Sequence, residues 1–277
     1  GFLIARFFVR GELRSVDHIA TILYSASPAE PDHPRGAMLT HHNLLSNLES
    51  LRQVFRVTRD DCILGLLPFS NSLGFSATLL LPMLTGARVV YAAQASSAGF
   101  GPICREARVT LIPATPALLS TIMENVAAQE LGELRHVAVG GGDLDERLRD
   151  SFAAKFGVEP LEGYGCPECA PIISLNVPDY VKGRQRQYGS RRGSAGHPLP
   201  GVCVRVADPQ SGEPLPQGKQ GVLMVRGPNV MKGYIDGAEA TSRVLLDGWY
   251  VTGELASLDS DGFIHMAARS ASPPPAS

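Results

Sequence analysis

Apolar and polar residues alternate in two different ways along the chain, and each way predicts a different kind of element. Five short apolar runs predict buried strands, at 19–24, 62–67, 87–91, 110–112 and 136–139. Between them, four longer stretches repeat apolar residues at helical spacing, at 42–54, 76–84, 116–128 and 144–156. Asn43 and Thr115 stand near two helix starts as expected caps. The alternation predicts an α/β fold, with a layered large domain on a largely parallel sheet.

The pattern changes near residue 182. Residues 182–192 hold five cations among Gly, Gln and Ser. This composition predicts a mobile polar connector, with an acidic or phosphate-rich partner as the alternative. Beyond it, short apolar runs at 202–207, 221–226 and 263–267 lie between Pro/Gly turns and predict a β-rich submodule. We therefore expect five parts: an N-terminal tail at 1–16, an α/β subdomain at 17–181, a basic loop at 182–192, a β-rich submodule at 193–269 and a disordered tail at 270–277.

Composition narrows the class of protein. With 277 residues and 44% hydrophobic content, the chain can bury a substantial core. Its net charge of -2 supplies no general attraction to nucleic acid. The longest apolar stretch, near 77–84, is far shorter than the ~20 residues of a membrane-spanning helix. We expect a cytoplasmic protein with no nucleic-acid partner and no transmembrane segment.

The first residue is not methionine, and the start of the chain carries no cleavable signal. We expect the chain to be part of a longer protein, and any peripheral association with the inner membrane to occur only through that longer parent. The five cysteines are sparse and odd in number, which fits a reducing compartment better than a disulfide framework. Cys166 and Cys169 have the spacing of half a zinc site, but no second pair stands at ligand spacing, so buried apolar thiols are the favoured interpretation.

Two short runs carry the clearest candidate chemistry, Tyr164-Gly-Cys-Pro-Glu168 and Asp247-Gly-Trp-Tyr-Val-Thr-Gly-Glu254. Together with the stretches 67–75, 80–91, 161–176 and 227–254, they resemble the adenylate-forming (AMP-binding) superfamily of acyl-CoA and acyl-carrier-protein synthetases. Within it, the chain is most similar to bacterial acyl-carrier-protein synthetases fused to glycerophospholipid acyltransferases. The resemblance covers about residues 17–269. The family continues into a small mobile C-terminal domain, which we expect this chain to lack.

The resemblance implies ATP-dependent joining of a fatty acid to acyl carrier protein or CoA, with ATP, AMP and Mg²⁺ as cofactors. Such chemistry needs hydrogen-bond donors for the phosphates, a ligand for the metal ion, and side chains that hold the nucleoside in place. On the matching positions, Tyr164 would stack on adenine, Glu168 would ligate Mg²⁺ through oxygen, and Glu254 would grip the ribose where the family has aspartate. Five further matches complete the cofactor-binding set: Gly140, Gly141, Gly142, Gly165 and Arg269.

Each of these positions also has a structural interpretation. Glu168 alone is typical of a surface carboxylate, and Arg269 alone is typical of a solvated cation. Trp249 and Tyr250 are favoured as packing residues beneath the ribose position, because large aromatic side chains contribute mainly buried area.

The segment at the position of the family's phosphate loop departs most from the pattern. Relatives have a Ser/Thr/Gly-rich turn ending in Pro-Lys-Gly, whose backbone N–H groups converge on phosphate. Here residues 24–35 contain no glycine, and prolines at 28, 31 and 34 supply no N–H. Glu30 and Asp32 add negative charge. Arg35 replaces the lysine, and its planar guanidinium can still form an ion pair with phosphate.

Two other positions depart from the family. Asn71 stands in place of a histidine, and Pro167 stands in place of a threonine. The catalytic candidates are therefore Glu168, Arg35 and Asn71. Catalytic parts act as a unit, so loss of one removes most of the rate.

Three hypotheses about function remain open from the sequence. The first is the large domain of an ATP-dependent fatty acid:acyl-carrier-protein or CoA ligase. The second is a catalytically inactive relative that binds a nucleotide, an acyl chain or a carrier protein. The third is a membrane-surface module that uses Arg191 and Arg192 of the basic loop.

Overall fold

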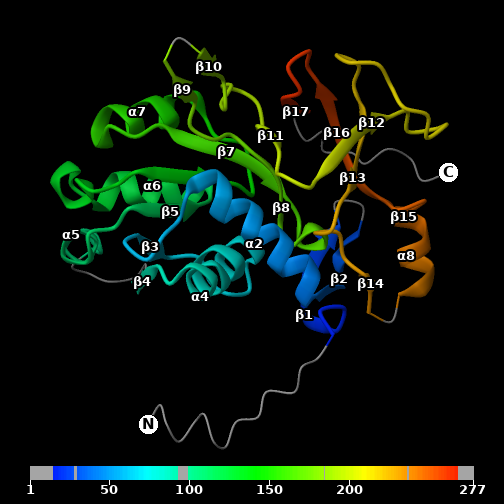
Figure 1. Cartoon of the computed structure of the whole chain (residues 1–277), viewed down its shortest axis with the longest axis horizontal. Coiled ribbons are helices and arrows are strands. Elements are labelled where there is room, and N and C mark those ends of the chain that lie inside the picture. Colours follow the sequence, from blue (N-terminus) through cyan, green and yellow to red (C-terminus); the bar gives the residue numbers. More distant parts are fainter. Residues whose placement is uncertain (1–14, 28–29, 93–98, 184, 236, 268–277) are drawn as a thin grey trace, which may run out of the picture.

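A computed structural model describes residues 15–27, 30–92, 99–183, 185–235 and 237–267. The described residues form a larger α/β part and a smaller β-rich part that lie side by side (Figure 1). No helix in these ranges combines the length and apolar character needed to cross a membrane.

A seven-stranded sheet in the order β11-β8-β7-β6-β5-β3-β4 forms the centre of the α/β part. The five strands β3 to β7 are parallel, and β8 and β11 join them antiparallel. The predicted, largely parallel sheet is confirmed. Its strands are β3 (Cys62–Gly65), β4 (Arg88–Tyr91), β5 (Leu111–Ala114), β6 (His136–Val139), β7 (Pro160–Gly165), β8 (Ile172–Leu175) and β11 (His197–Pro198).

Helices cover both faces of this sheet, because successive strand residues point to opposite faces and both faces are apolar. Ile63 and Leu111 pack in the cluster with α2 and α4, whereas Leu64 and Ile112 pack in the cluster with α5, α6 and α7. The helices are α2 (His41–Phe55), α3 (Ser72–Gly74), the π-helix η1 (Phe75–Leu80), α4 (Leu81–Thr85), α5 (Gly101–Ala107), α6 (Pro116–Asn125), the 3₁₀ turns η2 (Ala128–Leu131) and η3 (Pro167–Cys169), and α7 (Glu146–Phe156).

The helix starts follow capping chemistry. Thr115 caps α6 as predicted, by accepting from Leu118 N. The cap of α2 is Thr40 rather than Asn43, so that prediction was wrong. Thr40 Oγ1 accepts from Asn43 N at 3.1 Å, and Asn43 Oδ1 accepts from Thr40 N at 2.8 Å. The two residues form a capping box, in which Asn43 is the inner partner. Helix α5 was not predicted.

The first predicted strand lies outside the parallel sheet, which corrects its assignment as a buried parallel strand. β1 (Ile19–Ser27) pairs antiparallel with β2 (Glu30–Thr40), and β2 pairs with β14 (Gly233–Tyr234). The reason is the short connection, because a parallel crossover needs a dozen or more residues. Ile19 and Tyr24 are accordingly exposed rather than buried.

The β-rich part is an antiparallel sheet built around β13 and β16. The three predicted strands beyond residue 192 are confirmed as β12, β13 and β17. The elements are β12 (Cys203–Ala207), β13 (Gly221–Arg226), α8 (Ala238–Val244), β15 (Leu245–Leu246), β16 (Trp249–Leu258) and β17 (Ile264–Met266).

The predicted mobile connector contains ordered structure. β9 (Tyr180–Lys182) and β10 (Gln185–Gln187) form a hairpin. Arg191 makes ion pairs with Asp259 and Asp261, and Arg192 makes ion pairs with Asp150 and Glu159. The two arginines bind acidic side chains of this chain, so the expectation of a purely solvated connector was wrong for them.

Candidate functional site

A cleft of about 340 Å³ lies where the parallel strands β6 and β7 end. Ligands of open α/β sheets bind outside the carboxyl ends of the strands, so this is the expected position for a site. We call it the glycine-lined cleft. Gly141 and Gly142 follow β6, Gly163 and Gly165 belong to β7, and Glu254 on β16 completes the lining from the β-rich part.

The backbone at two of these positions requires glycine. Gly141 has a φ of 79°, in the left-handed region that side chains disfavour. A Cβ on Gly165 would collide with the carbonyl oxygen of Pro171. Gly140 lines the adjoining apolar cavity rather than the cleft. The glycines of the sequence prediction therefore lie together, on both sides of Tyr164.

Tyr164 lines both the cleft and the apolar cavity beside it, and thus forms part of the wall between them. Burial raises the pKa of its hydroxyl well above the usual value, and the nearby Cys166 and Glu254 raise it further. The side chain is therefore a neutral phenol at physiological pH.

Glu254 lies across the cleft from the glycines. Its backbone N–H donates to Thr252 Oγ1 at 3.1 Å, and that hydroxyl donates to Leu223 O at 2.9 Å. These bonds fix the strand on which the carboxylate stands. Arg269, the remaining predicted nucleotide contact, lies outside the described residues.

Besides Glu254, four charged residues line the cleft, and the sequence analysis missed all of them: Asp143, Glu146, Arg149 and Glu162. Arg149 of α7 forms an ion pair with Glu162 of β7, and both residues line the cleft. Arg149 is only 2% exposed. Burial of a charge requires a partner, so Glu162 is needed for the fold whatever else it contacts. A signal was present in the sequence, since Glu162 lies two residues before Tyr164 and therefore on the same strand face.

Glu168 lies in η3 and is 4% exposed. Oε1 accepts from the Tyr234 hydroxyl at 3.0 Å and from the Ser25 hydroxyl. The carboxylate does not line the glycine-lined cleft in the described structure. The described residues also contain no cluster of three or more His, Cys, Asp or Glu side chains that could hold a metal ion.

The segment expected as a loop at the phosphate position is a strand hairpin. Tyr24 pairs with Gly36 and Ser25 with Arg35, and beyond a register shift Ser27 pairs with Glu30, which leaves residues 31–34 outside the paired register. In an antiparallel ladder, N–H groups point alternately across to the partner strand and away from it. The amides of the paired residues therefore do not converge on one phosphate as those of an open glycine-rich turn do. Arg35 lies 5.6 Å from the ring centroid of Tyr234, in a cation–π contact.

Asn71 caps the short helix α3. Its Oδ1 accepts from Leu73 N at 3.0 Å and from Gly74 N at 3.1 Å. The residue also lines the apolar cavity near Gly140. Its carboxamide oxygen is thus occupied by the backbone, and its catalytic role stays a prediction.

Two apolar cavities extend from Tyr164 along the sheet, with volumes of about 90 Å³ and 50 Å³. The second lies between the sheet and the helices α2 and α4. Among its described lining residues, His136 alone has a polar side chain. Burial lowers the pKa of His136, and the neighbouring Arg135 lowers it further. The two cavities share four lining residues: Leu73, Ala138, Ile172 and Leu175.

The remaining predictions concern packing. Tyr250 is a core residue as predicted, whereas Trp249 is only partly buried and lies under the guanidinium of Arg205 at 4.5 Å. Cys169 is fully buried and Cys166 is half-buried, in agreement with a packing role for this pair.

Comparison with known proteins agrees with this geometry. The AMP-binding enzyme family matches residues 16–235. Feruloyl-CoA synthase of Amycolatopsis sp is 31% identical over 256 residues, which cover 92% of this chain and 50% of that protein. The long-chain-fatty-acid–CoA ligase of Bacillus subtilis strain 168 is 28% identical over 240 residues, which cover 85% and 41%. ATP-bound MatB from Rhodopseudomonas palustris superposes with a TM-score of 0.81 at 29% identity, over 94% of this chain and 50% of MatB.

The chain belongs to the AMP-binding enzyme family, because the family match extends over most of its length. Its mixed α/β fold is that of adenylate-forming enzymes. The chain spans about half the length of the curated relatives it matches.

Proposed function

We propose that this chain is the nucleotide- and acyl-binding part of an ATP-dependent ligase that joins a fatty acid to a thiol. One observation carries the proposal: the glycine-lined cleft and the apolar cavities meet at Tyr164. A polar nucleoside on one side of this ring and an apolar acid on the other would have their reactive ends in contact. Family chemistry of this kind forms an acyl-adenylate and then a thioester.

The proposed nucleoside site uses groups whose chemistry fits adenosine. Tyr164 would offer an aromatic face to the base, the turn at 140–142 and Gly165 would allow close backbone approach, and Glu254 would accept hydrogen bonds from the ribose hydroxyls. Arg269 would contact the nucleotide from beyond the described residues. Glutamate places its acceptors one methylene further out than aspartate, so the ribose grip is expected to be displaced by ~1 Å.

The identities of the acid substrate and of the thiol that accepts the acyl group are less narrowly defined than that of the nucleoside. The apolar cavities favour an acid with an uncharged tail, and the printed names of the relatives include ligases for feruloyl and long-chain fatty acyl groups. Both names specify CoA as the acceptor, which supports CoA for this chain. Acyl carrier protein remains the alternative from the sequence resemblance, and membrane association is proposed only for a longer parent.

The residues at the phosphate position do not fit ATP and Mg²⁺ in the described structure. The paired residues of β1 and β2 offer no converging amides, Pro31 and Pro34 supply no N–H, and Glu168 is buried under two hydroxyl donors. Arg35 is the one predicted catalytic cation there. These observations favour a second candidate function, a module that binds nucleoside and acyl chain without forming the adenylate on its own.

Calorimetry with AMP and ATP, followed by ATP–pyrophosphate exchange with Mg²⁺ and a panel of fatty acids, tests both functions. We expect AMP to bind, ATP to bind no more tightly than AMP, and exchange to be absent. Robust exchange would establish a working ligase and reject the binding module. Absence of AMP binding would reject both, since each requires the nucleoside site.

A further inference from the structure

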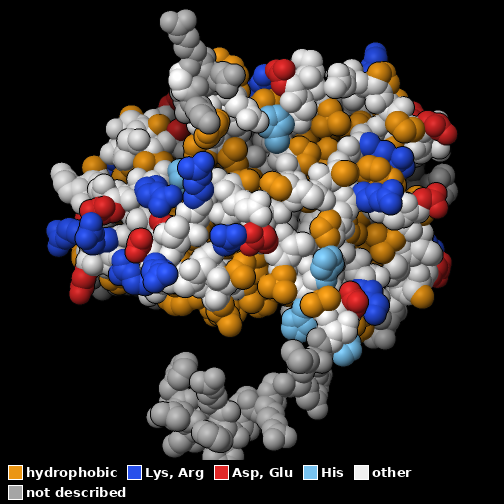
Figure 2. Space-filling view, in the orientation of Figure 1, with side chains coloured by type: hydrophobic (Ala, Val, Ile, Leu, Met, Phe, Trp, Pro, Cys, Tyr) orange, Lys and Arg blue, Asp and Glu red, His pale blue; other side chains and the backbone are white. Residues whose placement is uncertain are grey.

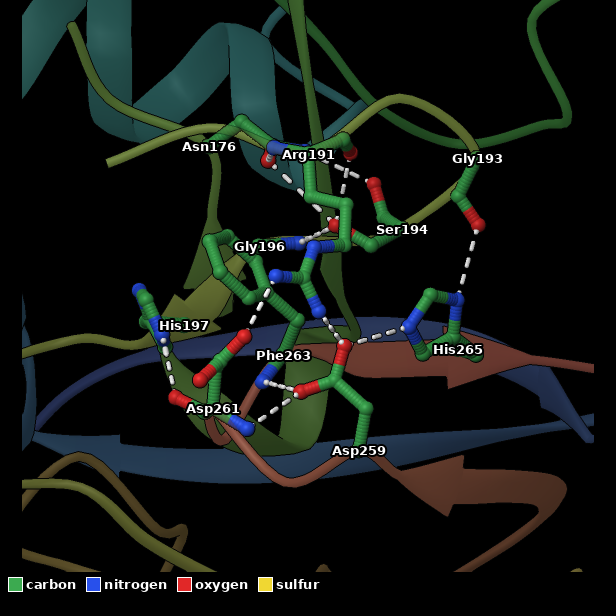
Figure 3. A network of polar contacts seen from close by, with 10 residues as sticks. All are labelled: Asn176, Arg191, Gly193, Ser194, Gly196, His197, Asp259, Asp261, Phe263 and His265. Atoms are coloured by element: carbon green, nitrogen blue, oxygen red, sulfur yellow. Dashed lines mark hydrogen bonds and ion pairs between the residues drawn. The ribbon is translucent and has the colours of Figure 1, made fainter. Parts of the chain in front are cut away.

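The two walls of the glycine-lined cleft beyond the sheet come from different segments. Gly193, Ser194 and Ala195 form one part, and Met266 and Ala267 form another. The first segment follows the β9–β10 hairpin, and the second begins at the end of β17. A network of polar contacts connects the first segment to His265, which precedes the second, and to the turn between β16 and β17 (Figure 3).

Arg191 is at the centre of this network. Its guanidinium forms ion pairs with Asp259 and, at 2.5 Å, with Asp261. The same guanidinium lies 4.5 Å from the ring centroid of Phe263. Its backbone N–H donates to Asn176 Oδ1 at 2.8 Å, which attaches the start of the segment to the end of β8. One side chain thus joins the 189–196 segment to the turn between β16 and β17.

His265 adds a second connection. Nε2 lies 2.9 Å from Asp259 Oδ2, and Nδ1 lies 3.3 Å from the carbonyl oxygen of Gly193. Both partners are acceptors, so the ring satisfies both only when it carries a proton on each nitrogen. Asp259 therefore contacts both Arg191 and the histidine that reaches the cleft wall.

Further bonds hold the 193–196 segment from within and from β8 and β17. Asn176 Nδ2 donates to Ser194 O at 2.7 Å, Gly196 N donates to Ser194 Oγ at 3.1 Å, and Ile264 N donates to Gly196 O at 3.0 Å. Gly193 and Gly196 both have positive φ, at 71° and 80°, and glycine has no side chain with which to anchor itself. Ser194 donates to Arg191 O at 2.8 Å, and Ala195 N donates to Ile264 O at 2.7 Å. The position of this wall thus depends on Arg191 and Asn176 at one end and on β17 at the other.

We propose that Arg191 is a positioning residue of the cleft, which holds the 193–195 wall at a fixed distance from the 266–267 wall. The inference rests on the proposed nucleoside site. Arg191 itself does not line the cleft, so it acts on a bound nucleoside only through the wall. A displacement of ~1 Å in such a wall can cost up to about a hundredfold in a function that depends on positioning.

The adjacent arginine provides a matched control. Arg192 also makes two ion pairs, at 2.9 Å with Asp150 and at 2.8 Å with Glu159, but neither acid lines the cleft. Arg191→Gln and Arg192→Gln remove the same charge from neighbouring positions. We expect Arg191→Gln to weaken AMP binding about tenfold or more in calorimetry, Arg192→Gln to change it less than twofold, and Arg191→Lys to restore part of the loss.

A second measurement separates positioning from general stability. Hydrogen exchange of the 193–196 amides should rise in Arg191→Gln and stay near wild type in Arg192→Gln, while the core strand β6 stays protected in both. If Arg191→Gln fails to fold, Asp261→Asn removes one ion-pair partner of Arg191 at an exposed position. It should weaken AMP binding and raise hydrogen exchange of the 193–196 amides in the same way, but by a smaller amount. Wild-type AMP affinity in Arg191→Gln would overturn the inference, whereas absence of AMP binding by the wild type would overturn the proposed function first.

Discussion

Tyr234 donates its hydroxyl hydrogen to Oε1 of Glu168 at 3.0 Å and so ties the turn after β7 to the strand β14 of a different sheet. The Ser25 hydroxyl donates to the same oxygen. Because Glu168 is 4% exposed, these two donors replace the water that an ionised carboxylate would otherwise bind. Burial raises the pKa of Tyr234, and the charge of Glu168 raises it further, so the tyrosine remains a donor at neutral pH.

Tyr234→Phe should therefore destabilise the protein. The substitution keeps the ring but leaves a buried carboxylate with one donor fewer, which costs about 1–3 kcal/mol. Urea unfolding at pH 7 measures the change. Tyr180→Phe, at a tyrosine that is 51% exposed, is the control and should be nearly neutral. Equal stability of the two variants would show that the Tyr234 bond contributes nothing.

Repair of the phosphate segment should increase ATP affinity more than AMP affinity. Asp32→Gly combined with Arg35→Lys produces Gly-His-Pro-Lys, which removes a negative charge, adds a flexible position and substitutes a compact ammonium for the guanidinium. We expect ATP binding to tighten about tenfold, with AMP affinity unchanged. Arg35→Lys alone is the control, because it keeps the charge and leaves the hairpin sequence intact. An equal gain for AMP and ATP would show that the change acts outside the phosphate position.

The apolar cavities suggest a limit on the length of the acid. The two cavities, together called the channel because they share lining residues, lie along β6 from Gly140 to His136, which is four strand steps or roughly 13 Å. Each residue of a strand contributes three backbone bonds, and an extended hydrocarbon chain advances by about the same distance for each three bonds. Four strand steps therefore correspond to about twelve carbons. Ala77 is 8% exposed and lines the part of the channel between α4 and the sheet.

Ala77→Phe should fill this part of the channel. We expect binding of dodecanoate to weaken at least about tenfold, while butyrate, which would not reach Ala77, binds as before. Competition against a fluorescent fatty acid measures both. Ala154→Phe on the exposed face of α7 is the control for the added ring. Loss of both acids to the same extent would show a general disturbance of the fold and not a limit on length.

The sequence was sufficient for the parts of the structure that depend on local pattern. The run at 136–139 is a strand whose residues alternate between two packed faces, and Thr115 caps the helix that follows β5. The family resemblance named Gly140, Gly141, Gly142, Tyr164 and Gly165, and the fold brings these residues together near the carboxyl ends of β6 and β7. Even the channel face of β6 follows from the spacing of His136 and Ala138.

Contacts between distant segments could not be predicted in the same way. The family resemblance implied a loop at 24–36, but residues there pair as strands, and β14 pairs with the far half of β2 from almost two hundred positions away. The burial of Glu168 depends on Ser25 and Tyr234, neither of which is near it in sequence. Arg191 was expected in a mobile loop, and only the fold places two aspartates of the β16–β17 turn beside it.

Asp259 makes the stability of this turn dependent on pH. Burial alone would raise the pKa of its carboxyl, but hydrogen bonds from His265, the Phe263 N–H and Arg191 outweigh burial and hold the pKa well below its usual range. A carboxyl with a depressed pKa in the folded state stabilises the protein at pH values above its unfolded pKa of ~3.9, and this contribution is lost as pH falls below that value.

Asp259→Asn should therefore lower the free energy of unfolding by about 1–2 kcal/mol at pH 7. The difference from wild type should shrink between about pH 4 and pH 2 as the wild-type carboxyl takes up its proton. Urea unfolding at pH 7, 5, 4 and 3 measures this, with Asp150→Asn, which removes an exposed ion pair with Arg192, as the control. A difference that stays constant across this range would mean that the lost hydrogen-bond geometry, and not the charge of Asp259, stabilises the turn.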